Sequence, residues 1–492
     1  MRTLGTVGLA LSLVAIMGLS ASAGTVAGGG LFVESEEGAS GKLTIGGELR
    51  TRMEVWQNFT DFDSGLADHL SYVDARVRLN LGFELTSGVQ VVVTPQARYI
   101  WGGWSGLNSP DFGSLAAEIP FLDDRDSFDL YQAYMKWGFE LFGRQMELTV
   151  GRMEMPLGSE MLFGDDSKYA GLSWDAVRLD IQVMDNLTTT LAVKKVVEND
   201  AFILAGASSV YPAGYINGSK MYNNDLDTFI VWSTYELSED ALVDLYLAYT
   251  SDKNAGGWWS GDPLYTAYGL EAKIWTLGSR VKFDKLVLFG QTFDASVELA
   301  VQTGKLTDGN NLLSPPWETK LDIQDAFAFE AEVGWSPAMA WSPRLAIGMA
   351  WASGDDDGSD GNYNHFNSLS QDVQGRLGKA DMFVLENIRC VYADLTCKPM
   401  DMEKLSAGIT YLKFNAFEEY DDQGVGGNFM VGGNNVNDVA DEFDIYAGYK
   451  LNENVEAKLC WSYIDPADQI SGGGSENNSP ANRVHLTLVV DF

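Results

Sequence analysis

The sequence predicts an all-β fold: a transmembrane, antiparallel, up-and-down β-barrel of about 18 strands. Three observations favour this fold class. Apolar and polar residues alternate in many segments of about ten residues or longer, the pattern of a strand whose two faces meet different surroundings. The connections between these segments alternate between short and long. In residues 482–492, apolar and polar residues alternate almost to the end of the sequence.

The alternating pattern occurs in 18 segments. They are residues 43–56, 70–86, 89–103, 127–140, 146–154, 172–183, 187–197, 226–237, 241–252, 267–283, 291–303, 325–336, 343–354, 383–398, 402–415, 441–451, 454–464 and 482–492. Pro95 falls inside the third segment and requires a β-bulge there, because proline has no N–H to donate to a neighbouring strand. In the tenth segment the polar row changes face between Lys273 and Arg280, so this strand is expected to be bulged or shorter than its segment.

The connections predict a membrane barrel rather than another all-β fold. Brief turns of turn-forming residues are Ser87-Gly88, Asp185-Asn186, 238–240 and Asn452-Glu453. Long connections without a period, rich in Gly, Asn and Asp, are residues 104–126, 198–225, 304–324, 355–382, 417–440 and 465–481. Short turns at one end, long loops at the other and an even strand number are what a transmembrane barrel requires. A secreted β-sandwich or propeller also alternates, but neither requires this alternation of loop length.

The final strand is expected to pair with the first, because an open sheet edge in hydrocarbon would leave backbone N–H and C=O groups unpaired. Its apolar row then faces lipid and consists of Val484, Leu486, Leu488, Val490 and Phe492. Aromatic residues near strand ends predict girdles at the two membrane interfaces. These residues are Trp56, Tyr99, Trp101, Trp137, Trp335, Trp351, Trp461 and Tyr463.

The amino terminus has the features of a signal peptide. Arg2 precedes an apolar run from Leu4 to Leu19, and the small residues Ala21-Ser22-Ala23 follow it. A short buried helix or a membrane anchor is the alternative. No later stretch reaches the roughly 20 apolar residues of a membrane-spanning helix. We therefore expect a signal peptide at 1–23, a short periplasmic segment at 24–42, and a barrel at 43–492 in the outer membrane of a Gram-negative bacterium.

Composition excludes several functions. The net charge is −36, from 33 Lys and Arg against 69 Asp and Glu, so we expect no binding of nucleic acid. Cys390 and Cys397 lie on one predicted strand, about 23 Å apart at the usual rise, too far for a disulfide. No cysteine spacing fits a metal site. The three histidines have no neighbouring Ser, Asp or His in a catalytic arrangement, so we expect no enzyme and no cofactor.

If the apolar rows face lipid, the polar rows line the lumen. The first three strands then carry a basic wall, formed by Arg50, Arg52, Arg76, Arg78 and Arg98. Roughly half a circumference away, later strands carry an acidic wall without a matching cation, formed by Asp244, Asp294, Glu298, Glu330 and Glu332. Two such walls would set up a field across the pore. Alternatively, these charges pair with neighbours and only keep the lumen wet, and the two roles can coexist.

Residues 354–362 form an acidic loop that could bind a structural Ca²⁺. Asp355, Asp357 and Asp360 place oxygen ligands among glycines that permit a tight path. The loop lacks the full spacing and the terminal Glu of an EF-hand, so a solvated acidic loop is the alternative reading.

Several stretches resemble the alginate-export family of outer-membrane porins. They are "GGELRTRMEVW", "LYQAYMKW", "TVGRMEMPLGSEMLFG", "SWDAVRL", "WASGDDDGSDGNYNHFNSL" and "EFDIYAGYKLNENVEAKLCWSYIDP". The resemblance covers nearly the whole mature chain and implies a monomeric 18-stranded barrel. In the members that give the family its name, an arginine-lined lumen passes anionic alginate with the help of a periplasmic synthesis complex. This sequence departs from that pattern because its predicted lumen also carries many carboxylates.

Three functional hypotheses follow. The first is a channel that passes small hydrophilic solutes or anions by passive diffusion. The second is an exporter of an anionic polysaccharide such as alginate, and the third is a barrel enzyme or an adhesin that uses the long acidic loops. Expected partners are outer-membrane lipid, lipopolysaccharide, and the barrel-assembly machinery through the aromatic terminus Phe492. A monomer is expected and an oligomer is left open, because loops 104–126 and 198–225 could fold inward or cap a neighbour.

Overall fold

The computed structural model of the chain describes residues 24–26, 30–34, 40–58, 62, 69–85, 88–101, 127–165, 171–197, 226–252, 270–308, 320–357, 360–369, 376–399, 402, 404–419, 437–467 and 479–492. The predicted signal peptide (1–23) and the loops 104–126 and 198–225 lie outside these residues. In the part of the chain that the structure describes, no helix is long and apolar enough to cross a membrane.

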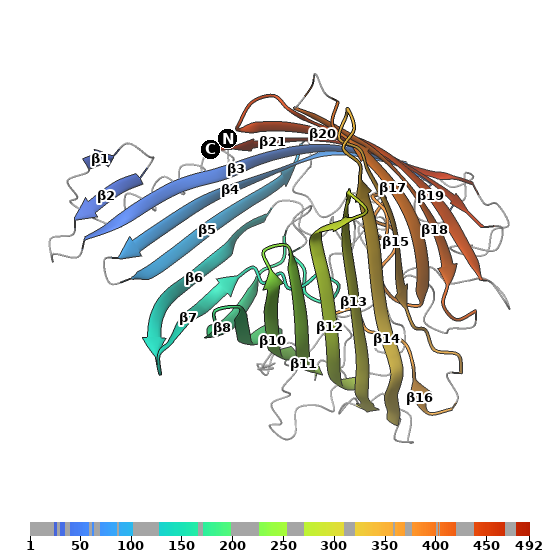
Figure 1. Ribbon diagram of the computed structural model, residues 1–492, viewed down its shortest axis with the longest axis horizontal. Helices are drawn as coiled ribbons and strands as arrows, with labels where there is room; N and C mark the ends of the chain where they lie inside the picture. The colour runs from blue at the N-terminus through green and yellow to red at the C-terminus, as the bar shows by residue number, and fades with distance from the viewer. Residues whose placement is uncertain are drawn as a thin grey trace, which may run out of the picture.

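Eighteen of the 21 described strands form one closed antiparallel ring (Figure 1). The ring consists of β3 (Ser40–Gln57), β4 (Leu70–Leu85), β5 (Val89–Ile100), β6 (Ser127–Leu141), β7 (Arg144–Met153), β8 (Trp174–Met184), β9 (Leu187–Val197), β10 (Leu226–Ser238), β11 (Ala241–Asp252), β12 (Leu270–Leu288), β13 (Gln291–Asp308), β14 (Lys320–Ser336), β15 (Arg344–Ala352), β17 (Ile388–Cys397), β18 (Leu405–Ala416), β19 (Asp438–Lys450), β20 (Val455–Pro466) and β21 (Ala481–Asp491). Each strand pairs with the next around the ring. All 18 predicted segments overlap these strands, so the predicted fold class is confirmed.

Three short strands lie outside the ring. β1 (Gly24–Val26) and β2 (Gly30–Glu34) form a hairpin within the predicted periplasmic segment 24–42. β2 pairs with the beginning of β3, which starts three residues before the predicted barrel boundary at residue 43. β16 (Asn362–Tyr363) pairs in parallel with β14.

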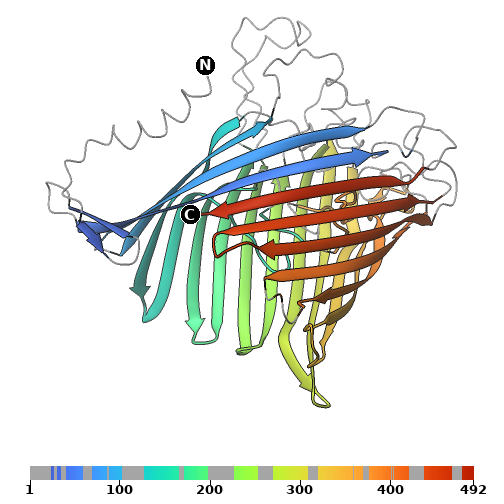
Figure 2. The same ribbon diagram turned by 90° about the horizontal axis from the view of Figure 1, so that it is seen from above.

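The barrel closes between β21 and β3, as Figure 2 shows for the red and blue strands. The last residue, Phe492, donates its N–H to Gly47 O at 3.0 Å and accepts from Gly47 N at 2.8 Å. The Phe492 ring lies against Gly47 so closely that a Cβ there would be 2.5 Å from the ring, which only glycine avoids. Leu486 and Leu488 point outward and are exposed, whereas Thr487 is buried inside, so the predicted facing of the closing strand is confirmed.

The structure confirms the bulge near Pro95 and corrects the prediction for the tenth strand. Thr94 pairs with Gln132 and Pro95 with Leu130, so Tyr131 of β6 is the extra residue. The tenth strand, β12, is longer than predicted and keeps its register with β11 from 272 to 283; its bulge follows, next to the short turn. Lys273 is an exposed residue of the outer face, near the long-loop end. Polar residues occur on the outer face there, and the sequence pattern alone could not separate them from lumen residues.

One predicted girdle residue does not face lipid. Trp56 is buried inside the barrel because residue 56 shares the inward face of β3 with Arg50 and Arg52. Tyr99, Trp101, Trp137, Trp335 and Trp461 are exposed, as expected for the interfaces.

The two faces of a strand should respond oppositely to a cation. Val297 of β13 is exposed toward lipid between Val281 and Ala331, whereas Ser296 points inward between Lys282 and Glu332. We expect Val297→Arg to destabilise the barrel by about 2–4 kcal/mol, because a cation near the midplane loses its hydration. Ser296→Arg should be tolerated beside the Glu332 carboxylate. Unfolding in urea from lipid vesicles measures both, and equal losses would contradict the assigned faces.

Candidate functional site

The lumen carries the predicted basic wall on adjacent strands. Arg50 on β3 pairs with Arg76 on β4, which in turn pairs with Arg98 on β5. Arg52 and Arg78 extend this row along the barrel axis. All five positions lie on the inward faces because the alternate residues, such as Leu49 and Met53, are exposed toward lipid.

Carboxylates of the same strands hold these arginines in place. Arg50 Nη2 lies 2.9 Å from Asp74 Oδ2, Arg52 Nε lies 2.7 Å from Glu54 Oε1, and Arg76 Nη2 lies 2.8 Å from Glu48 Oε1. The guanidinium of Arg78 stacks 3.6 Å from the centroid of the Tyr131 ring, which the bulge on β6 directs inward. Arg50, Arg52 and Arg76 each have at least one carboxylate beside them, and Arg78 has an aromatic ring. These contacts restrict the directions of the four side chains.

Arg483 adds a sixth arginine at the seam of the barrel, which was not among the predicted residues of the basic wall. Its guanidinium lies 3.1 Å from Glu54 Oε2 and over the Trp56 ring. The inward residues of 48–54, 74–80, 96–98 and 483–487 thus comprise six arginines and three carboxylates. This part of the lumen wall has a net positive charge.

The predicted acidic wall also faces the lumen, but it does not lack cations. Arg280 Nε lies 2.7 Å from Asp244, and Arg344 Nη2 lies 2.5 Å from both Asp294 and Glu332. The expectation of an unmatched acidic wall is therefore wrong. The cations lie one or two strands away from these carboxylates, at positions that only the strand register reveals. The two walls consequently do not oppose each other as separate blocks of charge.

Glu298 and Glu330, the other two predicted acidic residues, are covered by chain that enters the barrel. Glu298 Oε1 accepts from the Tyr246 hydroxyl at 2.9 Å and its Oε2 accepts from Ser159 N at 3.1 Å. Arg376 Nε lies 2.7 Å from Glu330 Oε1. Ser159 and Arg376 belong to connections between strands, so these connections lie inside the lumen.

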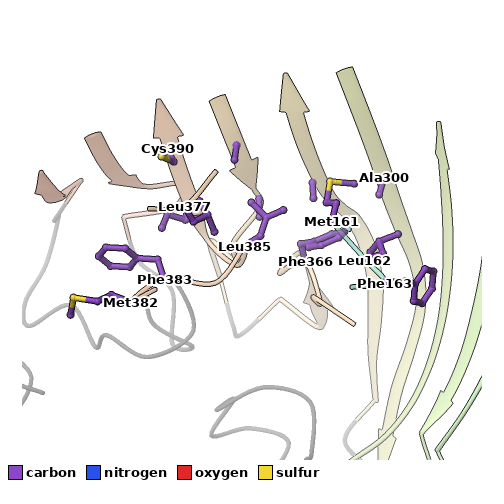
Figure 3. Packing of buried hydrophobic residues seen from close by; sticks show 14 of the residues in the cluster. Met161, Leu162, Phe163, Ala300, Phe366, Leu377, Met382, Phe383, Leu385 and Cys390 are labelled. Atoms are coloured by element: carbon purple, nitrogen blue, oxygen red, sulfur yellow. The ribbon is translucent and has the colours of Figure 1, made fainter. Parts of the chain in front are cut away.

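We call these connections inner loop A (residues 154–165, after β7) and inner loop B (described residues 353–357, 360–369 and 376–387, between β15 and β17). Their apolar side chains pack on inward residues of strands from β7 to β21. Figure 3 shows part of this cluster. Loop A contributes Met155, Leu157, Met161, Leu162 and Phe163, and loop B contributes Phe366, Leu377, Ala380, Met382, Phe383 and Leu385. The facing strands make room with small inward residues, among them Ala300, Ala328 and Ala350.

Loop A is a tight turn held against the wall. Leu157 N donates to Phe163 O at 2.9 Å, and Glu160 N donates to Leu157 O at 3.1 Å. Gly158 has a φ of 69°, and a Cβ there would lie 2.6 Å from the Trp232 ring. The turn therefore requires glycine at this position, and it presents Ser159 to the wall.

Arg376 joins the two inner loops. Besides the ion pair with Glu330, its Nη2 donates to Ser159 O at 2.5 Å, and Ser159 Oγ donates to Glu330 Oε2 at 2.9 Å. Burial acts to lower the pKa of Arg376, but pairing with Glu330 outweighs it, so the pKa lies above its ordinary value and the side chain stays charged. One residue of each loop and one of the wall thus form a single hydrogen-bonded junction.

Residues 378–380, which we call the strap, attach loop B to β19 and β21, the strands on the carboxyl-terminal side of the seam. Lys379 N donates to Asp444 Oδ2 at 3.1 Å and Ala380 N donates to Glu442 Oε1 at 2.9 Å, both on β19. Arg483 Nη1 of β21 donates to Lys379 O at 3.2 Å and to Ala380 O at 2.8 Å. The strap is therefore fixed to two strands through its backbone.

The possible calcium loop does not form a cluster of carboxylates in the described residues. Asp355 is buried, whereas Asp360 is exposed and accepts from Asn362 N and Nδ2 at 2.7 Å each. No group of three His, Cys, Asp or Glu side chains within the described ranges could hold a metal ion together. Calcium binding by Asp355, Asp357 and Asp360 stays a prediction, which calcium-dependent protease protection of the loop would test.

A closed 18-stranded barrel with an outward apolar row and a charged lumen defines a channel of the Gram-negative outer membrane. The chain belongs to the alginate export family: residues 42–482 match the family model described as "Alginate export". The predicted resemblance and location are thus confirmed.

Solved barrels share the fold at low sequence identity. The chain is similar to Pseudomonas aeruginosa OccK11 (OpdR), with 10% identity, a TM-score of 0.54, and coverage of 92% of this chain and 96% of that one. It is also similar to P. aeruginosa OpdK solved with vanillate (12% identity, TM-score 0.53, coverage 91% and 98%). P. aeruginosa OccK2 (OpdF) in complex with glucuronate gives 13% identity, a TM-score of 0.52, and coverage of 91% and 98%. No curated protein sequence matches the chain.

Proposed function

We propose that this outer-membrane channel passes small hydrophilic solutes by passive diffusion and favours small anions, carboxylates above all. The observation that carries the proposal is the division of the lumen. The inner loops pack on the inward faces of many strands from β7 to β21, whereas the inward residues of β3–β5 carry a net positive charge. The side chains of Arg50, Arg52 and Arg76 are themselves buried, so this wall acts through its field rather than through direct contact with a solute. Positive charge along a narrow path favours anions.

The inner loops favour small solutes over a polymer such as alginate. Loops A and B join each other and the wall through Ser159, Glu330 and Arg376, and their apolar side chains pack on the strands. A polysaccharide exporter would have to displace this packing for its polymer to pass. Vanillate and glucuronate, named with two of the similar barrels, are small carboxylates, which supports the proposed solute class. We propose no catalytic role for the lumen.

The sequence also suggests three proposals about the molecules that surround or bind this chain. We propose that the chain works as a monomer, that lipopolysaccharide surrounds its long-loop end, and that the barrel-assembly machinery engages the aromatic terminus Phe492. The closed ring of strands supports the first, because it leaves no barrel edge to pair with another chain. The exposed Phe492 ring beside Gly47 supports the third.

Ion selectivity tests the proposed function. Replacing Arg50, Arg52, Arg76 and Arg78 together by Ser should move the reversal potential in a planar bilayer under a KCl gradient toward cation selectivity. Replacing Glu48 and Asp74 by Gln and Asn should move it toward anion selectivity, because the same wall then loses negative charge. Heat-dependent mobility in SDS gels verifies that each barrel is folded. A folded quadruple variant with the parent's reversal potential would show that the wall does not border the conducting path.

A further inference from the structure

The strap holds a lysine whose backbone is fixed but whose charge is not paired with any carboxylate of the described residues. Lys379 N donates to Asp444 and its C=O accepts from Arg483, while its neighbour Ala380 donates to Glu442. Gly378 lies directly on Glu442, where a Cβ would meet the carboxylate within 2.5 Å. Because contacts on both sides fix the backbone of Lys379, the direction of its side chain is restricted.

The ammonium group of Lys379 points along the lumen toward the short-turn end. Its Nζ lies 4.3 Å from the centroid of the Tyr446 ring, two residues beyond Asp444 on the inward face of β19. Tyr446 itself donates its hydroxyl to Asp394 at 2.6 Å. Lys379 is only partly buried as a residue, so part of its side chain is accessible to solvent inside the barrel, and the Tyr446 ring lies against one side of the ammonium.

The environment of this cation differs from that of the basic wall. Arg50, Arg52 and Arg76 each lie within 3.0 Å of a carboxylate oxygen, and all three side chains are nearly inaccessible. Among the described residues, no carboxylate oxygen lies within 4.0 Å of Lys379 Nζ and no acceptor is hydrogen-bonded to it. The Tyr446 ring stabilises the cation through its π face and accepts none of the N–H groups in a conventional hydrogen bond.

We propose that Lys379 is the specificity-determining residue of the channel, the cation that receives the carboxylate of a passing solute. This inference rests on the proposed function and names the residue that confers it. An ammonium with unoccupied donors gains a charge-assisted hydrogen bond from a carboxylate, whereas a paired guanidinium must first give up a bond it already has. The wall arginines supply the surrounding positive field, and Lys379 supplies the contact.

Two variants of Lys379 and one control test the proposal in planar bilayers. In gradients of KCl and of potassium benzoate, Lys379→Gln should lower the anion-to-cation permeability ratio by about fivefold, the Boltzmann factor of one unit charge about 4 Å away in water. Lys379→Arg should keep most of the ratio. The control is Lys458→Gln, because Lys458 also lies in the lumen but pairs with Glu456 at 3.1 Å, so its loss should change the ratio little.

The outcomes separate this inference from the proposed function. A folded Lys379→Gln channel with the parent's permeability ratio overturns the role of Lys379, even if the quadruple arginine variant shifts as expected. An equal shift for Lys379→Gln and Lys458→Gln also overturns it, because any lumen lysine would then suffice. A parent barrel that is folded but carries no current, or excludes benzoate, would instead contradict the proposed function itself.

Discussion

Arg376→Gln should give larger and noisier single-channel currents than the parent protein. Arg376 holds loop B to Glu330 of β14 at 2.7 Å and to the Ser159 carbonyl of loop A at 2.5 Å. Hydrogen bonds to charged groups contribute about 1.5–3 kcal/mol each, so losing both removes a large part of what keeps the two loops together. The loops should then separate in part of the population and widen the path, which recordings in symmetrical KCl would detect.

The control for this prediction is another arginine of similar position along the chain. Arg389, at the start of β17, points outward and lies 4.6 Å from the centroid of the Phe417 ring. Arg389→Gln should leave the conductance at the parent value, whereas Arg376→Lys should be intermediate, because an ammonium keeps the charge but not the forked geometry. Unchanged conductance and noise in Arg376→Gln would mean that apolar packing alone holds the inner loops.

Much of the barrel could be predicted because period-two alternation reports which face of a strand meets lipid. The 18 strands of the ring and the inward direction of Arg50 or Glu330 follow from that one rule, and the closure by residues 482–492 follows when the cost of an open edge in hydrocarbon is added. The rule also limits what can be predicted. It assigns a side chain to a face, but it does not say what that face packs against.

The inner loops show this limit. Inward positions such as Ala328, Ala350 and Leu412 are apolar, although a water-filled lumen favours polar residues. Apolar residues on both faces near the long-loop ends were the available signal that something covers the inner face. The ion pairs of the acidic wall could not be predicted for a different reason. Arg344 pairs with Asp294 two strands away, so this pairing depends on the register between strands rather than on the residue pattern within one strand.

The second large effect is expected at the seam, where Arg483→Met should destabilise the barrel by about 3–5 kcal/mol, the usual cost of breaking a buried ion pair from one side. Arg483 and Glu54 are 1% and 0% exposed, and Arg483 also donates to the carbonyls of Lys379 and Ala380. The variant leaves Glu54 with Arg52, at 2.7 Å, as its nearest cation and removes both hydrogen bonds to the strap. The temperature at which the folded band disappears from SDS gels should fall.

Two further variants distinguish the ion pair from simple loss of packing. Adding Glu54→Gln to Arg483→Met should recover part of the stability, because the carboxylate that lost one of its two cations, and keeps only Arg52, is then neutral. Arg152→Gln is the exposed control: Arg152 pairs with Asp175 at 2.7 Å, but the side chains are 42% and 56% exposed, so its loss should cost less than about 1 kcal/mol. If Arg483→Met and Arg152→Gln lower the unfolding temperature equally, the buried pair does not stabilise the seam. If the double variant is less stable than Arg483→Met, the incompletely compensated charge of Glu54 is not the source of the loss, and the bonds from Arg483 to the strap become the principal contribution.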